Sequence, residues 1–98
     1  MITLDAFRSS VSDASPPKDA RPALQALWWA AKGDWNEAHK CVQAHEDDAE
    51  CNWVHAHLHH QEGDMSNGGY WYRRAGQSYE AYADAKAELA AIKAVLTY

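Results

Sequence analysis

Two cysteines and two histidines have a spacing that could bind a metal ion. Cys41 and His45 stand four residues apart, and so do Cys51 and His55. If each pair lies on one of two adjacent antiparallel helices, two thiolates and two imidazoles would meet and could bind zinc tetrahedrally. Each residue is also an ordinary occupant of a helical core, and neither pair has the tighter Cys-x-x-Cys spacing. The sequence therefore leaves two alternatives, a zinc site or no cofactor.

Histidine is concentrated in one segment. The chain has six histidines, and His55, His57, His59 and His60 follow one another closely. On a helix with 100° per residue, His55 and His59 share one face, whereas His57 and His60 lie on another face together with Trp53. The four histidines need not form one site.

For His55 and His59 two interpretations stay open. The first is that both are neutral core imidazoles bonded to neighbouring polar groups, because buried polar groups are usually paired. The alternative is a polar pocket with Tyr70, Tyr72 and Arg74, in which a guanidinium and an imidazole bind a small anionic ligand. Their i,i+4 spacing is also a second potential metal chelate. No residue stands out as a nucleophile, so no catalytic residue is expected.

Composition argues against several classes of partner. The chain has 98 residues and a formal net charge of −5, which fits one domain and gives no attraction to nucleic acid or to an anionic membrane. Arg73 and Arg74 are too few for a nucleic-acid groove. The first residues show no targeting pattern, and no apolar stretch reaches membrane-spanning length. We therefore expect a cytoplasmic protein with free thiols.

The spacing of apolar residues predicts an all-α fold. We expect an N-terminal arm and linker over residues 1–19 and a helical domain over residues 20–98. Within that domain we expect one antiparallel helical hairpin over 20–45, a second over 47–76 and a C-terminal helix over 78–97. In the last helix, Leu89, Ile92 and Leu96 would either close the bundle or pair with a second copy in a homodimer.

Local residues predict where the helices begin and end. Gly33 and Gly63 would each stop a helix in the left-handed conformation, and the aspartate after each glycine would cap the next helix. Asp47, with Glu50 three residues later, would form a capping box, and Ser78 would cap the last helix.

Two adjacent glycines, Gly68 and Gly69, fall inside the helix predicted over residues 65–75. Each glycine costs a helix about 1 kcal/mol relative to alanine. Close approach of a neighbouring helix would explain their presence.

The two predicted hairpins repeat one another. An offset of 30 residues aligns Ala26 with Ala56 and the Gly-Asp turn at residue 33 with that at residue 63. The order of residues in each hairpin resembles tetratricopeptide and Sel1-like repeats. The first helix has a small residue, a Gly-Asp turn follows, and the second helix has a small residue and then a bulky one. The resemblance covers Pro22 to Gly76 and implies that each hairpin packs on the next.

The same resemblance implies positions for the histidines of the first helix in the second hairpin. His55 and His59 would pack against the second helix of their hairpin, whereas Trp53, His57 and His60 would face the concave, ligand-binding surface. The segments over residues 53–59 and 70–76 also resemble a group of short microbial proteins, and this resemblance implies no activity.

Our leading functional hypothesis is a protein- or peptide-binding or assembly module that presents Trp53, His57 and His60 to a partner. The alternative is a small-ligand or zinc-binding protein that uses the histidine-rich helix, through either the polar pocket or the Cys/His set described above. An independent enzyme ranks third, because the imidazoles have no evident catalytic partners.

Overall fold

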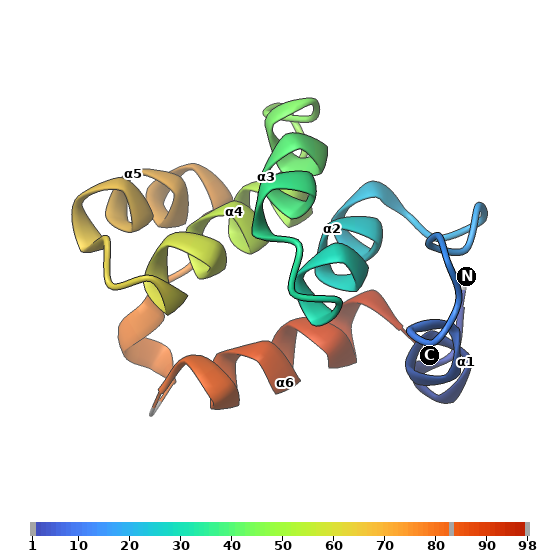
Figure 1. Ribbon diagram of the computed structural model, residues 1–98. Coiled ribbons are helices and arrows are strands. Elements are labelled where there is room, and N and C mark those ends of the chain that lie inside the picture. Colours follow the sequence, from blue (N-terminus) through green and yellow to red (C-terminus); the bar gives the residue numbers. More distant parts are fainter. Residues whose placement is uncertain (1, 83, 98) are drawn as a thin grey trace.

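The computed structural model describes residues 2–82 and 84–97 and confirms the all-α prediction (Figure 1). Its elements are α1 (Leu4–Ser10), α2 (Pro22–Ala31), α3 (Trp35–Gln43), α4 (Ala49–Gln61), α5 (Met65–Ala75), the 3₁₀ turn η1 (Tyr79–Ala81) and α6 (Ala85–Leu96). Met1, Ala83 and Tyr98, which belong to the predicted arm and C-terminal segment, lie outside the described residues. Within the described ranges no strand occurs, and no helix is long and apolar enough to cross a membrane.

The helices pack in sequential pairs. α2 packs mainly on α3, and α4 packs mainly on α5, with a short turn inside each pair. α3 also contacts α4. α6 crosses α4 and α2 on the side opposite α3 and ends near α1 (Figure 1). The histidine-rich helix α4 therefore lies between neighbours on two sides.

The two glycine–aspartate turns have the predicted geometry. Gly33 and Gly63 have φ values of 83° and 80°, in the left-handed region that glycine adopts without a Cβ clash. Asp34 caps α3, since its carboxylate accepts the backbone N–H of Glu37 at 3.1 Å. Asp64 caps α5 in the same way. Local sequence alone therefore fixes these two helix starts.

The prediction for the start of α4 is wrong by one residue. Asp48, not Asp47, is the N-cap, and its carboxylate accepts the backbone N–H groups of Glu50 and Cys51 at 2.9 and 3.4 Å. Asp47 and Asp48 are adjacent carboxylates that could each cap a helix, so the sequence pattern alone did not distinguish them.

The start of the C-terminal helix is also later than predicted. The Ser78 hydroxyl accepts the backbone N–H of Glu80 within the turn η1. α6 itself begins at Ala85, where Asp84 is the N-cap and accepts the backbone N–H of Ala87 at 2.8 Å. Both Ser78 and Asp84 are good capping residues, and the intervening turn uses the first of them.

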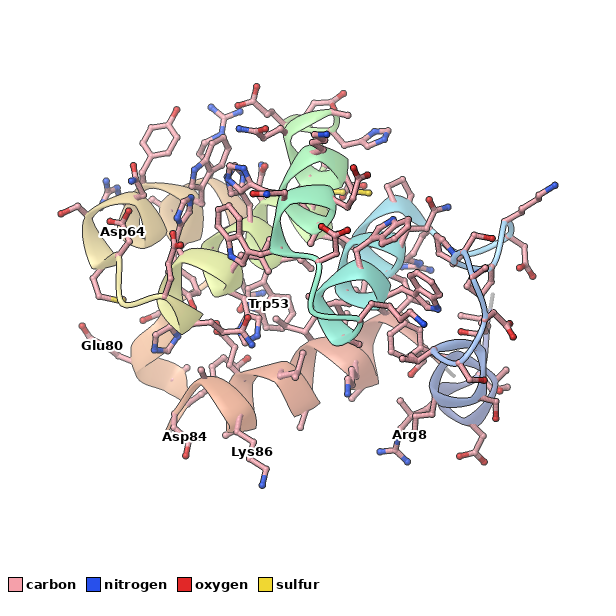
Figure 2. All side chains as sticks on the ribbon, in the orientation of Figure 1. Arg8, Trp53, Asp64, Glu80, Asp84 and Lys86 are labelled. Carbon is pink, nitrogen blue, oxygen red and sulfur yellow. The ribbon has the colours of Figure 1, made fainter. Side chains whose placement is uncertain are left out.

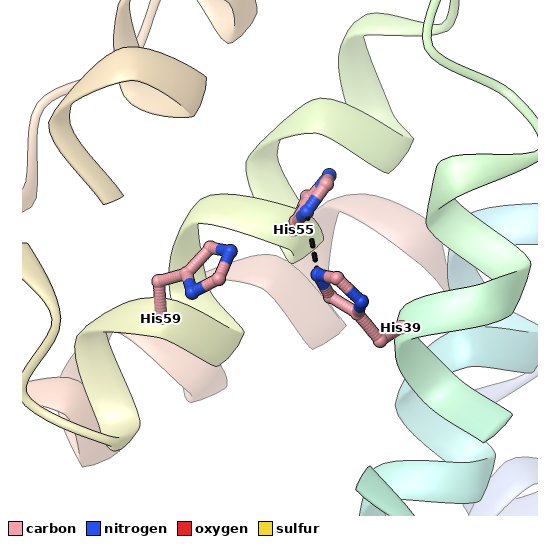
Figure 3. Close-up of side chains that lie close together, drawn as sticks. All are labelled: His39, His55 and His59. Carbon is pink, nitrogen blue, oxygen red and sulfur yellow. Dashed lines mark hydrogen bonds between the residues drawn. The ribbon is translucent and has the colours of Figure 1, made fainter. Parts of the chain in front are cut away.

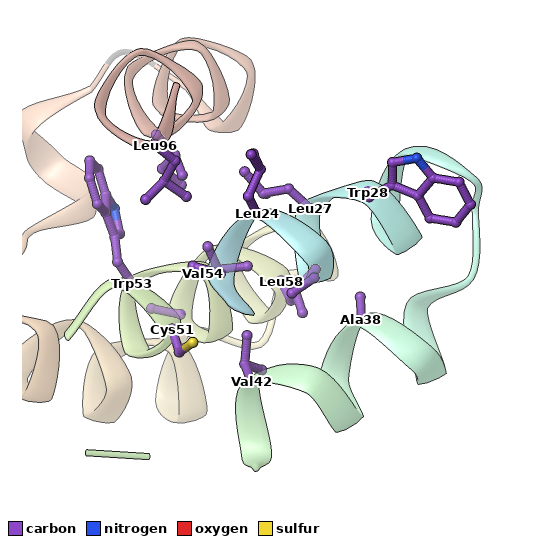
Figure 4. Close-up of a cluster of buried hydrophobic side chains, with 14 of the residues drawn as sticks. Leu24, Leu27, Trp28, Ala38, Val42, Cys51, Trp53, Val54, Leu58 and Leu96 are labelled. Atoms are coloured by element: carbon purple, nitrogen blue, oxygen red, sulfur yellow. The ribbon is translucent and has the colours of Figure 1, made fainter. Parts of the chain in front are cut away.

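The apolar core lies where α2, α3, α4 and α6 meet (Figure 4). It includes Leu24, Leu27 and Trp28 from α2, Ala38 and Val42 from α3, Val54 and Leu58 from α4, and Ile92 and Leu96 from α6. The apolar seam of the last helix thus packs against the chain's own core.

The N-terminal arm contributes to the same core. Phe7 is only 1% exposed, and the Trp28 indole donates to the backbone carbonyl of Ser10 at 3.1 Å. Lys32, at the end of α2, adds a surface contact with the arm: its ammonium donates to the backbone carbonyl of Val11 at 2.7 Å. α1 is therefore packed against the end of α2.

Only one of the paired glycines meets a neighbouring helix. A Cβ placed on Gly68 would lie 3.6 Å from the carbonyl oxygen of Ala56 and 3.6 Å from the Cβ of His59, both on α4. At Gly69 the nearest such atom belongs to Arg73, on the same helix. The prediction of close approach is therefore confirmed at Gly68, where the space still admits a methyl group.

We predict that Gly68→Ala raises the free energy of unfolding by up to about 1 kcal/mol, because alanine favours the helix and its methyl fits. The matched variant Gly33→Ala should lower it by about 1 kcal/mol or more, because an L-residue is strained at φ 83°. Urea unfolding followed by circular dichroism measures both values. A clear loss of stability in Gly68→Ala would contradict the spacing between α4 and α5.

Candidate functional site

The helix α4 is buried along most of its length. Every residue from Cys51 to His59 is buried, as expected for a helix with packed elements on both sides. Imidazoles in such a position need hydrogen-bond partners. The structure supplies these partners from different helices on the two sides of α4.

On the side facing α6, a carboxylate network surrounds Glu88, whose side chain is fully buried. The Tyr72 hydroxyl contacts both carboxylate oxygens, at 2.7 and 2.5 Å. His57 Nδ1 lies 2.6 Å and His60 Nδ1 3.3 Å from Oε1, and the Trp53 indole donates to Oε2 at 3.2 Å. We call these five residues the Glu88 network.

The donors of the network keep Glu88 ionised. Burial by itself raises the pKa of this carboxyl, but the hydrogen bonds from His57 and Tyr72 outweigh burial and hold the pKa below its usual value. Because the carboxylate is an acceptor, we assign the proton of His57 to Nδ1. The other ring nitrogen of His57, Nε2, is buried and has no hydrogen-bond partner among the described residues.

The expectation that Trp53, His57 and His60 form an open binding face is wrong. Trp53 is 4% exposed and His57 is 1% exposed, and His60 is half-buried. Trp53 lies between α4 and α6 (Figure 2), because α6 covers this face and inserts Glu88 among the three side chains. Glu88 was missed from the sequence, although a single acidic residue on an otherwise apolar helix face was a signal for it.

On the other side of α4, three imidazoles from two helices lie close together. His39 Nε2 on α3 and His55 Nε2 on α4 are 2.8 Å apart. One nitrogen from each of His39, His55 and His59 lies within 4.8 Å of the nitrogens of the other two. Figure 3 shows the three rings facing a common space between the helices. We call this group the three-histidine cluster.

Aromatic and acidic neighbours hold the cluster in place. Trp35 stacks on His39 with ring centroids 4.5 Å apart, and Trp71 stacks on His55 at 3.9 Å. Glu62 Oε1 lies 2.8 Å from His59 Nδ1, so this carboxylate occupies one nitrogen of the ring and leaves Nε2 for another contact. Each ring is thus oriented by a partner outside the cluster.

Burial keeps the imidazoles of His39 and His55 neutral. Burial, followed by the charges of His39 and His59, lowers the pKa of His55 to about 3. Burial and the neighbouring His59 also lower the pKa of His39, against an opposing effect of Glu62. At neutral pH both rings are therefore uncharged, and each has one nitrogen with a lone pair; the 2.8 Å hydrogen bond between the two Nε2 atoms uses one of these lone pairs. His55 Nδ1 is buried without a hydrogen-bond partner in the described part of the chain.

The structure does not bring together the predicted set of Cys41, His45, Cys51 and His55. Among the described residues, the only groups of three ligand atoms within 4.8 Å are the three-histidine cluster and His59 with Glu62 and Asp64. His45 is exposed. Burial and nearby acidic groups raise the pKa of Cys51 to about 12, which disfavours the thiolate that a metal needs. His55 instead pairs with His39.

The structure divides the predicted pocket of His55 and His59 with Tyr70, Tyr72 and Arg74. The Tyr72 hydroxyl binds Glu88 in the network described above. The Arg74 guanidinium donates to the backbone carbonyl of Glu46 at 3.0 Å. His55 and His59 remain together and are joined by His39, which the sequence did not single out, while Arg74 stays beside Tyr70, with Nη1 3.5 Å from the hydroxyl.

Comparison with known proteins gives no match to a family model, to a curated protein or to a solved structure. Of the two polar groups on α4, the Glu88 network is built around a carboxylate held by hydrogen bonds, whereas the three-histidine cluster brings nitrogens of three rings within 4.8 Å of one another, two of them on uncharged rings.

We predict that acid destabilises the metal-free protein through His55. Its pKa is lowered from 6.5 to about 3 in the folded chain, so between these values the unfolded chain binds a proton that the folded chain does not. Stability from this group is complete above about pH 6.5 and falls as the pH decreases. The expected loss is on the order of 2 kcal/mol between pH 6.5 and 4.5.

Urea unfolding at several pH values, with chelator present, measures this loss. The variant His55→Phe should show a flatter dependence on pH, while the control variant His45→Ala, at an exposed position, should keep the dependence of the natural chain. Equal slopes in the two variants would contradict the neutral, buried state of His55.

Proposed function

We propose that this protein binds a transition-metal ion, with Zn²⁺ as the first choice, through His39, His55 and His59. The observation that carries the proposal is that one nitrogen from each ring lies within 4.8 Å of the other two. Neutral imidazole is a good ligand for zinc, copper and nickel, so the donor set selects this class of ion over magnesium or calcium.

The spacing of His39 Nε2 and His55 Nε2 suits a tetrahedral ion after a small adjustment. Zinc–nitrogen bonds of 2.0–2.1 Å place tetrahedral ligand atoms about 3.3 Å from one another. His39 Nε2 and His55 Nε2 are 2.8 Å apart, so these rings would separate by about half an ångström. The ion would replace the hydrogen bond that now joins the two nitrogens.

Groups around the cluster have the roles that neighbours of metal ligands usually have. Glu62 binds Nδ1 of His59, and such a carboxylate orients a ligating imidazole and increases its basicity. The stacked rings of Trp35 and Trp71 restrict His39 and His55. Three histidines leave a fourth tetrahedral position for water or for a small ligand.

The prediction is one Zn²⁺ per chain in calorimetric titration of chelator-treated protein. His39→Ala and His59→Ala should each weaken binding at least about tenfold, because each removes a ligand, and Glu62→Gln should weaken it by roughly 10-fold to 100-fold. Zinc should also raise the melting temperature of the natural chain. Circular dichroism of each variant checks that it is folded.

Two matched controls separate this site from the Cys/His set. His45→Ala and Cys41→Ser change residues of that set which lie outside the three-histidine cluster, so both should bind zinc like the natural chain. Loss of binding in these variants, together with retention in His39→Ala, would overturn the proposal in favour of the Cys/His set.

A second candidate function is binding of a protein or peptide at the outer face of α5. Tyr70 is 47% exposed, and the Arg74 guanidinium lies 5.8 Å from the Tyr70 ring centroid and 5.4 Å from that of Trp71. Aromatic residues and arginine are enriched in binding hot spots. This face, rather than the one that α6 covers, would receive the partner.

For this second candidate, the double variant Tyr70→Ala/Arg74→Ala is expected to lose the partners that the natural chain captures from the source cells. The control Lys40→Ala, an exposed residue on α3, should retain them. Mass spectrometry of the captured proteins compares the three chains. Identical partner sets for all of them would exclude this face as a binding surface.

A further inference from the structure

The face that α6 presents to solvent carries lysine and small apolar residues and no acid. The helix has a single acidic residue, Glu88, and that residue is fully buried. Its exposed residues within these bounds are Lys86, Ala87, Ala90, Ala94 and Val95. The outer face of a helix usually carries polar and charged residues, whereas an exposed apolar surface with a charged rim is typical of an interaction site.

A groove runs along this face of α6 and reaches α1. Its volume is about 290 Å³. α1 lies at the C-terminal end of α6 (Figure 1) and contributes Leu4 and Arg8 to the lining. The lining residues on α6 extend from Lys86 to Ala94, a distance of about 12 Å along the helix axis, or a little more than two turns.

Every charged residue that lines the groove is a cation. These residues are Arg8, Lys86 and Lys93, and no ion pair joins any of them to an acid among residues 2–82 and 84–97. Asp5 on α1 and Asp84 at the start of α6 do not line the groove. Figure 2 shows Arg8 and Lys86 extending from the same edge of the molecule. Three cations on one groove, in a chain with a formal net charge of −5, are complementary to an acidic partner.

The spacing of the lining residues on α6 selects a helical partner. Lys86, Leu89, Ala90 and Lys93 follow the i, i+3, i+4, i+7 pattern and therefore lie along one side of the helix. An amphipathic helix laid along this side would pack its apolar residues on Leu89 and Ala90, and the small side chain of Ala90 permits close approach. A second copy of the chain fits poorly, because a two-fold contact through the groove would bring the cations of both copies together.

We propose that the groove between α1 and α6 binds an acidic amphipathic helix of a partner protein. The aliphatic residues of that helix would pack on Leu4, Leu89 and Ala90, and its carboxylates would pair with Lys86 and Lys93. These residues belong neither to the three-histidine cluster nor to the outer face of α5. The groove is therefore a separate surface from the two described above.

The test uses the full chain and a synthetic peptide of about 20 residues, which is long enough to form a helix. The peptide carries leucines along one face, with glutamates beside them at seven-residue spacing. Calorimetric titration measures the affinity, and ¹⁵N spectra of the chain should show saturable shifts on α1 and α6. Lys86→Glu/Lys93→Glu should bind at least about tenfold more weakly, because like charges then face each other. The same variant should prefer a peptide with lysine in place of each glutamate.

Two control variants separate the groove from general charge effects. Lys18→Glu/Lys40→Glu makes the same change in net charge at exposed positions outside the groove and should bind the peptide like the natural chain. Tyr70→Ala/Arg74→Ala should also bind it normally, so this result is independent of the proposed surface on α5. Ala90→Trp fills the groove without a change of charge and should abolish binding.

Absence of saturable binding, or equal weakening by the two double charge reversals, would overturn the proposal. Dimers of the natural chain in light scattering that Ala90→Trp dissociates would assign the groove to a second copy instead. Binding of phosphatidylglycerol vesicles without binding of the peptide would assign it to a membrane surface. If circular dichroism shows that Lys86→Glu/Lys93→Glu is unfolded, normal peptide binding by Ala90→Trp would overturn the proposal.

Discussion

The buried carboxylate of Glu88 is the constraint on which the arrangement of the helices depends. An ionised group can be buried only if hydrogen bonds replace its water shell. Tyr72 from α5 and Trp53 and His57 from α4 supply those bonds, so α6 has to hold Glu88 within reach of both helices, which restricts its register. Removing one partner of such a buried group commonly costs about 3–5 kcal/mol, which makes this network a strong determinant of where α6 packs.

This position of α6 divides the histidines of α4 into two groups with different surroundings. His57 contacts Glu88, and the half-buried His60 reaches the same carboxylate. His55 and His59 point toward α3 and α5, where His39 joins them. The four histidines between residues 55 and 60 thus have two different roles. The first group holds the helices together, and the second is the group that we propose to bind an ion.

The sequence predicted the features that depend on neighbouring residues and failed where distant residues decide. The Gly33 and Gly63 turns and the caps at Asp34 and Asp64 follow from local backbone chemistry, so they could be predicted. The separation of His55 and His59 from His57 and His60 follows from helical periodicity and was also correct. The role of Glu88 depends on how α6 docks, and the role of His39 depends on how α3 lies against α4. Neither packing can be derived from single-residue spacing, which is why an open binding face was expected where α6 lies.

The most direct test of this division is a zinc titration followed by long-range proton–nitrogen spectra of all six histidine rings. Our account predicts that ring-nitrogen signals of His39, His55 and His59 change together and stop changing at one equivalent of zinc. Signals of His57 and His60 should stay in place, because Glu88 continues to hold both rings. Zinc-dependent changes that begin at His45, or that spread equally over His57 and His60, would contradict the assignment of separate roles to the two groups.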